Sequence, residues 1–173
     1  NKKKRMGMYK SIKTIDISAY AGDLKIGIVS TEWNPDVVNS LLSACKLTLT
    51  TAGIEENQLV CIEVPGAYEL PLGAKLIMEN QKCDAIICLG CVIKGETTHD
   101  EHINRAVSSA LMQLGLMSDI PVIFGLLTTN TEEQAKERSG GSKGNKGSEA
   151  ASTALKMIDL KKSFSKSKKK IGY

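Results

Sequence analysis

Short apolar segments alternate along this chain with longer segments in which apolar residues recur every three or four positions. Segments that are almost unbrokenly apolar and only seven to nine residues long are typical of strands buried on both faces, as in a parallel sheet covered by helices. We therefore predict four parallel strands, at residues 24–30, 58–64, 85–93 and 121–127. A weaker alternation over residues 12–17 predicts a further, peripheral strand near the N-terminus.

Helical spacing predicts a helix after each of these four strands. After the first strand, Asn34 is the expected N-cap, Pro35 the first helical residue, and Gly53 the stop. The second helix is expected from about Ala67 to Glu79, with Pro71 in its first turn. A third is expected after His99, a short fourth over 131–137, and a last one after the glycine-rich segment 139–148. The apolar stripes of the first, third and last helices are Val37, Val38, Leu41, Leu42, Cys45 and Leu49; Ile103, Ala106, Val107, Ala110, Leu111 and Leu114; and Ala150, Ala151, Ala154, Leu155 and Ile158.

Alternating strands and helices with short linkers favour one α/β domain with helices on both faces of a parallel sheet. The expected fold is a three-layer α/β/α sandwich of the flavodoxin-like kind, with four parallel strands. The predicted organisation is a basic N-terminal extension over residues 1–22, a main α/β domain over 23–160 and a basic C-terminal tail over 161–173.

The charge of the chain divides unevenly. Residues 1–10 hold five of the 23 Lys and Arg residues and residues 161–173 hold six, which leaves 12 basic residues against 19 acidic ones between them. Solvated basic tails are favoured over nucleic-acid binding, because no interleaved aromatic residues or known binding module accompany the lysines. No apolar run reaches the roughly 20 residues that cross a bilayer, and the basic N-terminus lacks the apolar stretch of a secretory signal.

The cysteines indicate reduced thiols rather than disulfides or metal ligands. Five cysteines, an odd number, favour a cytoplasmic protein. Cys88 and Cys91 lie three apart in a predicted strand and should point to opposite faces of the sheet. The two histidines, His99 and His102, and the scattered acids form no convincing metal site, so no metal is expected.

The most distinctive segment joins the third strand to its helix. Residues 94–99, Lys-Gly-Glu-Thr-Thr-His, carry the chain from the carboxyl end of a central strand to a helix N-terminus, where a threonine can cap and free N–H groups can bind an anion. His99 could act as a general acid or base, or as a partner of a phosphate group.

Three other loops should reach the same edge of the sheet, because the carboxyl ends of parallel strands lie together. Trp33 either stacks on a flat ligand or packs beneath its loop. In the loop after the second strand, Gly66 and Ala67 allow close approach to the backbone, and Glu69 either accepts from hydroxyl groups or merely favours a helix start. Around the glycine-rich segment, the basic residues Arg138, Lys143 and Lys146 either close over an anion or form a surface linker.

Four motifs in order resemble the lumazine synthase family over residues 23–160. They are KIGIVSTEWN, VPGAYELP, CVIKGETTH and the segment from PVIFGLL to GGSKGNKG. The resemblance implies a cofactor-free transferase of riboflavin biosynthesis, a 6,7-dimethyl-8-ribityllumazine synthase. It would condense 5-amino-6-(ribitylamino)uracil with 3,4-dihydroxy-2-butanone 4-phosphate and release phosphate and water.

The resemblance also implies a role for each site residue. Trp33 would stack on the pyrimidine, His99 would transfer protons, and Arg138 would neutralise the phosphate. The expected substrate-binding residues are Trp33, Gly66, Ala67, Tyr68, Glu69, Cys91, Val92, Ile93, Glu96, Thr97, Phe124, Arg138 and Lys146. In the family, the counterparts of Phe124, Arg138 and Lys146 reach the site from a neighbouring subunit, which implies at least a pentameric ring.

Three features stay open from sequence. A pentamer, a decamer and a sixty-subunit icosahedral shell are all compatible with the motifs, and association with riboflavin synthase is a partnership that the resemblance raises. An archaeal-type riboflavin synthase and a non-catalytic lumazine-binding or flavin-binding shell protein are the alternative functions. The chain also departs from the family pattern at Glu32, where the family often has a basic residue, at Trp33, where phenylalanine is commoner, and at Asp100-Glu101, which replaces an aromatic-acid pair.

Overall fold

Four parallel strands form the central layer of the molecule. The computed structural model describes residues 15–168, and the side chains of residues 15–166. The strands are β1 (Ile26–Thr31), β2 (Leu59–Val64), β3 (Ala85–Ile93) and β4 (Val122–Thr129), and their order in the sheet is β2-β1-β3-β4. All three pairings are parallel. The four predicted strands are therefore confirmed, each within two residues at either end.

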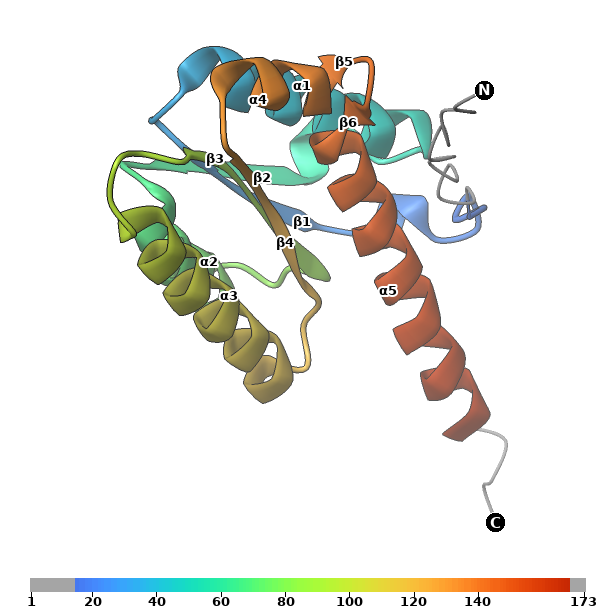
Figure 1. Cartoon of the computed structure of the whole chain (residues 1–173). Helices are drawn as coiled ribbons and strands as arrows, with labels where there is room; N and C mark the ends of the chain where they lie inside the picture. Colours follow the sequence, from blue (N-terminus) through green and yellow to red (C-terminus); the bar gives the residue numbers. More distant parts are fainter. Residues whose placement is uncertain (1–14, 169–173) are drawn as a thin grey trace, which may run out of the picture.

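Helices cover both faces of this sheet (Figure 1). Helices α1 (Pro35–Thr51) and α5 (Lys146–Lys168) lie on one face, and α2 (Leu70–Asn80) and α3 (His99–Ser118) lie on the other. A short α4 (Glu132–Arg138) and a two-stranded antiparallel pair, β5 (Ser139–Gly141) and β6 (Gly144–Asn145), precede α5. Single 3₁₀ turns span Ala21–Asp23, Glu56–Gln58 and Ala67–Glu69. The three-layer sandwich expected from the sequence is confirmed.

The core divides into two apolar clusters, one on each face of the sheet. Ile28 and Ile87 pack with Leu41 of α1 and Ala154 of α5 on one face. On the other face, helices α2 and α3 pack against Val29, Cys88 and Leu126. Cys91 belongs to the first cluster and Cys88 to the second, so the two thiols lie on opposite faces as predicted.

Helices α1 and α5 approach each other at backbone distance. A Cβ atom added to Gly147, in the first turn of α5, would lie 1.9 Å from the carbonyl oxygen of Leu41 in α1. Only glycine fits such a contact, because a carbonyl oxygen cannot turn away as a flexible side chain can. The contact sets where α5 begins, and hence where the residues just before it lie.

The predicted N-terminal strand is wrong over residues 15–17, and residues 12–14 lie outside the described residues. Instead the chain turns: the Asp16 carboxylate accepts from the Ser18 N–H at 2.9 Å, and the Tyr20 N–H donates to the Ile17 carbonyl at 2.9 Å. The Ile17 side chain is buried in the core. The local hydrogen bonds of an aspartate therefore override a weak alternation of apolar residues.

Two predicted caps differ in detail. Asn34 occupies the N-cap position of α1, but its φ is +56° and its side chain makes no capping bond; instead its amide donates to the Cys91 carbonyl at 3.0 Å. At α3 the N-cap residue Thr98 makes no side-chain bond, and the hydroxyl of Thr97 accepts from the His99 N–H at 3.4 Å. The Asn34 side chain therefore connects two loops, whereas the Thr97 hydroxyl makes a local bond at the start of α3.

Three other elements depart from their predictions. Helix α2 begins at Leu70, after a 3₁₀ turn, and Ala106 of the predicted α3 stripe is exposed. The segment 139–148 is not a loose linker, because it folds into the β5–β6 pair and the first turn of α5. Positive φ angles at Gly140 and Gly144 allow this tight reversal. The glycines of this segment therefore form a turn.

Candidate active site

The loops that follow β1, β2, β3 and β4 leave the sheet at one edge, which we call the rim. Backbone hydrogen bonds continue the strand pairing into these loops: the Glu32 N–H donates to the Val64 carbonyl at 2.9 Å, and the Lys94 N–H donates to the Thr129 carbonyl at 2.8 Å. The Asn34 amide, bonded to Cys91, ties the loop after β1 to the end of β3. The rim is thus a connected set of four loops.

Trp33 and Gly66 lie against each other at the rim. The indole of Trp33 is 71% exposed, although tryptophan is mostly buried in folded proteins. A Cβ atom on Gly66 would lie 3.4 Å from Cδ1 of Trp33, so the absence of a side chain lets the ring lie over the backbone of the loop after β2. The ring therefore offers a flat apolar surface beside an exposed peptide backbone.

Glu69 holds the backbone of this loop by a hydrogen bond. Its Oε2 accepts from the Gly66 N–H at 3.0 Å, which closes the 3₁₀ turn Ala67–Glu69. The half-buried Ala67 and the exposed Tyr68 side chain lie within that turn. One carboxylate oxygen of Glu69 thus holds the loop. Of the two roles that the sequence leaves open for Glu69, favouring a helix start is therefore part of what this side chain does.

The end of β3 supplies backbone rather than side chains. Cys91 is buried, and Val92 and Ile93 are half-buried. Burial raises the pKa of the Cys91 thiol to about 11, so the thiol is protonated at neutral pH and is a poor nucleophile. Chemistry at this strand end therefore rests on its peptide groups.

Residues 94–99 form the corner between β3 and α3. Glu96, Thr97, Thr98 and His99 are all exposed. Among the described residues, the backbone N–H groups of Glu96, Thr97 and Asp100 have no hydrogen-bond acceptor. Free N–H groups at a helix N-terminus favour an anion. The corner therefore has the geometry of an anion site.

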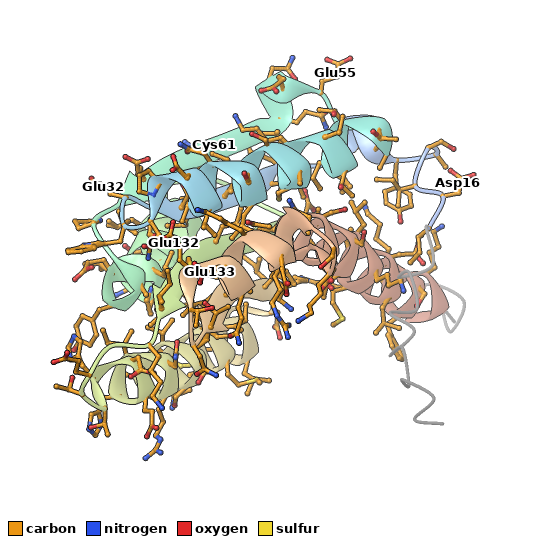
Figure 2. The ribbon with its side chains drawn as sticks, turned by 45° about the horizontal axis from the view of Figure 1, so that its top comes forward. Asp16, Glu32, Glu55, Cys61, Glu132 and Glu133 are labelled. Carbon is orange, nitrogen blue, oxygen red and sulfur yellow. The ribbon has the colours of Figure 1, made fainter. Side chains whose placement is uncertain are left out.

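The charges around the corner oppose an anion, however. Glu96, Asp100 and Glu101 lie at or just after the corner, whereas Lys94 is the single cation within residues 94–99, and Arg105 follows four residues after Glu101. Glu32 in the loop after β1, and Glu132 and Glu133 in the first turn of α4, add further carboxylates, of which Glu132 pairs with Lys136 at 2.9 Å (Figure 2). A phosphate group held here needs cations from outside this acidic rim.

Cations gather in a separate cavity beside β4, which we call the basic cavity. It has a volume of about 360 Å³ and is lined by Phe124, Leu126, Leu127, Thr128, Arg138, Lys143, Lys146 and Glu149. Three of the predicted site residues, Phe124, Arg138 and Lys146, therefore meet in it. None of the predicted residues of the rim lines it.

Arg138 is the cation of this cavity that remains available. Lys143 pairs with Glu137 at 2.9 Å, and Lys146 pairs with Glu149 at 3.6 Å. Within the described part of the chain, the exposed guanidinium of Arg138 has no ion pair or hydrogen bond. A planar guanidinium with unused donors suits bidentate binding of a phosphate.

Sequence reasoning missed the acids that hold this cavity and the buried acid of the corner. Glu137 and Glu149 fix the two lysines, and only the three-residue spacing of Lys146 and Glu149 hinted at such a pair. Asp100 is 9% exposed, and its Oδ1 atom is buried without a hydrogen-bond partner. The apolar stripe of α3 was the signal that could have found it, because residue 100 falls on the same helical face as Val107 and Leu111.

No group of three or more His, Cys, Asp or Glu side chains in residues 15–166 could hold a metal ion. In the same part of the chain, every helix is too short or too polar to cross a membrane.

Comparison with known proteins identifies relatives over most of the chain. The family described as 6,7-dimethyl-8-ribityllumazine synthase matches residues 23–162. Proteins of that name from Bacteroides fragilis and Rhodopirellula baltica are each 48% identical to this chain, over 83% and 79% of it and over 100% and 88% of their own lengths. One from Parabacteroides distasonis is 42% identical over 88% of this chain and 96% of its own length.

Proposed function

Because the chain belongs to the 6,7-dimethyl-8-ribityllumazine synthase family, we propose that its rim and its basic cavity are the two halves of a lumazine synthase site. The reaction condenses 5-amino-6-(ribitylamino)uracil with 3,4-dihydroxy-2-butanone 4-phosphate, with loss of phosphate and water. It forms carbon–nitrogen bonds between amines and a ketone, and it needs proton transfers but no redox step.

The Trp33–Gly66 surface is the observation that supports this function most directly. A pyrimidine ring stacked on the exposed indole would lie beside the peptide backbone of the loop after β2. Ala67, Tyr68 and Glu69 would hold the pyrimidine and its ribityl chain, and Cys91, Val92 and Ile93 would contribute backbone contacts. The ring edge would then face the corner where Glu96 and Thr97 hold the butanone phosphate.

His99 would move the protons. It stands in the first turn of α3, directly after the corner, and its imidazole is exposed. Imine formation and loss of phosphate both need a group that gives and takes a proton near neutral pH. Holding two substrates in register supplies a further, larger part of the rate.

We propose further that the basic cavity of one subunit completes the rim of its neighbour. Among the described residues, the rim has N–H groups without acceptors in an acidic surrounding, whereas the basic cavity has two lysines and a guanidinium without an ion pair. Phosphate binding needs both, and within one chain the cavity is lined by none of the rim residues. A head-to-tail ring of subunits would join opposite charges at every interface.

An apolar groove beside the basic cavity supports this assembly. It has a volume of about 910 Å³ and lies between α3 and α5 along the edge strand β4. Met112 and Leu116 of α3, and Met157 and Leu160 of α5, are between 42% and 74% exposed and line it. Phe124 lines both the groove and the basic cavity. Apolar surface of this kind beside a functional residue is typical of a subunit interface.

The first test mixes the two substrates with the protein and follows formation of the fluorescent lumazine while the active species is sized in the same sample. Turnover in a pentameric or larger species is the expected result. Riboflavin formed from lumazine alone would instead identify a riboflavin synthase, and lumazine binding without turnover would identify a binding protein.

The second test asks whether one site uses two chains. His99→Ala carries a defective rim and Arg138→Ala a defective cavity, and each forms only impaired sites by itself. If the two variants are unfolded together and reassembled in equal amounts, about a quarter of the sites in a head-to-tail ring combine an intact rim with an intact cavity. Activity should therefore rise well above the mean of the two separate variants.

The control is each variant unfolded and reassembled alone. If both halves of the site came from one chain, the mixture would show only the mean activity of the two variants, and the shared site would be excluded. Unchanged affinity of Arg138→Ala for the butanone phosphate would separately exclude the role of the guanidinium.

A further inference from the structure

Asp100 is a buried carboxylate that nothing in the described structure neutralises. Its side chain is 9% exposed, and Oδ1 has neither solvent contact nor a hydrogen-bond partner. No ion pair reaches it from the described residues. Buried carboxylates are ordinarily paired, because an isolated charge is costly to remove from water. A buried carboxylate without a partner at the start of α3 therefore needs a functional explanation.

The position of Asp100 is the first turn of α3, two residues after the N-cap Thr98. It continues the stripe of Val107 and Leu111, the other buried residues of this helix, so it lies on the side that packs against the sheet. Its own backbone N–H is one of the free N–H groups of the corner. An anion bound to that N–H would be held by the same residue that carries the carboxylate.

Glu101 is the matched comparison. It is the next residue of the same turn, it carries the same charge, and it is exposed. Solvent and salt screen an exposed charge, whereas a buried charge acts on its neighbours with much less screening. Asp100, and not Glu101, should therefore dominate the electrostatic environment of an anion at the corner.

We propose that Asp100 weakens phosphate binding at the corner, so that the inorganic phosphate released by the reaction leaves the site. The inference rests on the function proposed above. A first-turn carboxylate competes with an incoming anion for the positive end of the helix, and two like charges within several ångströms repel each other. The acidic corner thus holds phosphate only while Arg138 is also engaged.

The test compares wild-type protein with Asp100→Asn and Glu101→Gln, which each remove one charge. Inorganic phosphate is the probe, and its dissociation constant is measured directly by calorimetry. Asp100→Asn should bind phosphate about tenfold more tightly, and Glu101→Gln should differ less than about twofold from wild type. Raising the salt concentration should abolish the small effect of Glu101→Gln and leave most of the larger one.

Steady-state kinetics supply the second measurement. In Asp100→Asn, the KM for the butanone phosphate and the inhibition constant of inorganic phosphate should both fall about tenfold. The KM for the pyrimidine substrate should stay the same, because that substrate carries no phosphate. A merely structural role of Asp100 would change both KM values or neither.

Equal phosphate binding by Asp100→Asn and wild type would overturn the inference, and so would equal tightening by Glu101→Gln. Asp100→Ser, another short neutral residue suited to a helix start, repeats the comparison if the asparagine variant does not fold. Calorimetry with phosphate does not depend on turnover. If wild-type protein makes no lumazine, the proposed function fails, while the effect of Asp100 on phosphate is still measured.

Discussion

The imidazole of His99 can be tested against the other histidine of the same helix. His99→Ala should lose about 100-fold of activity or less, because most of the rate in this proposal comes from positioning two substrates, and general acid–base catalysis adds a factor at the lower end of its usual range. Turnover of the purified variant at saturating substrate gives the measurement.

His102→Ala is the matched control, since His102 is exposed one turn along α3 and has no place in the proposed site. It should keep the wild-type rate. Complete loss of activity in a folded and assembled His99→Ala protein would contradict this prediction, because it would mean that proton transfer by the imidazole, and not substrate positioning, supplies most of the rate.

The buried thiols make a second prediction at the residue scale. Burial raises the pKa of Cys88 to about 12, well above the value of an unfolded thiol near 9. Between these values the unfolded chain has lost the proton and the folded chain keeps it, so the free energy of unfolding falls as pH rises. The slope is at most about 1.4 kcal/mol per pH unit for one thiol.

Urea unfolding at several pH values between 8 and 10.5 measures this slope. Cys88→Ala should reduce the slope by the share of one thiol, because the buried Cys45 and Cys91, whose pKa values are raised to about 12 and about 11, still contribute. Cys61→Ala, at an exposed position on β2 visible in Figure 2, should change it less. An unchanged slope in Cys88→Ala would show that this thiol ionises in the folded protein as easily as in the unfolded chain.

At the scale of elements, the contact between α1 and α5 sets the position of the basic cavity. Gly147 lies against the Leu41 carbonyl, one residue after Lys146 and two before Glu149. The cavity residues therefore depend on a contact made far away in the sequence. This is why a short glycine-rich segment, which suggests a mobile linker by composition, holds charged side chains in fixed pairs.

Gly147→Ala should lower the free energy of unfolding by about 2 kcal/mol or more, because a methyl group would overlap a backbone oxygen and force the helices apart. Denaturant unfolding measures the change. Gly22→Ala is the control, since nothing lies within 4 Å of a Cβ atom there. If Gly147→Ala were as stable as Gly22→Ala, the two helices would separate without cost.

At the scale of the whole molecule, the function requires surface that a single chain leaves exposed. The apolar groove along β4 and the basic cavity adjoin through Phe124, so assembly and phosphate binding should be lost together. Met112→Glu places a charge in the groove. The variant should fall apart into smaller species and lose activity in parallel, as measured by light scattering and lumazine formation.

Met117→Glu makes the same substitution on the same helix at a residue that does not line the groove. It should assemble and turn over normally. A fully active, monomeric Met112→Glu protein would contradict the proposal that each site is shared between neighbours.

Much of this molecule follows from its sequence, and for local reasons. The four strands and the main helices are set by the spacing of apolar residues, because burial of those residues drives folding and their period distinguishes strand from helix. The corner at residues 94–99 was also predictable, since loops after parallel strands must reach one edge of the sheet. The peripheral strand over 15–17 was not, because one aspartate bond outweighed a weak alternation.

The sequence by itself determined the fold class, the family motifs and the one edge of the sheet at which the loops after the four strands leave it. Only the tertiary structure decided that Glu69 holds the Gly66 backbone and that Glu137 and Glu149 pair with the two lysines. It also decided that, among residues 15–166, Arg138 has no ion pair and the buried Oδ1 of Asp100 has no hydrogen-bond partner. These outcomes depend on distances and burial between segments remote in the chain. A linear pattern of residues specifies neither quantity.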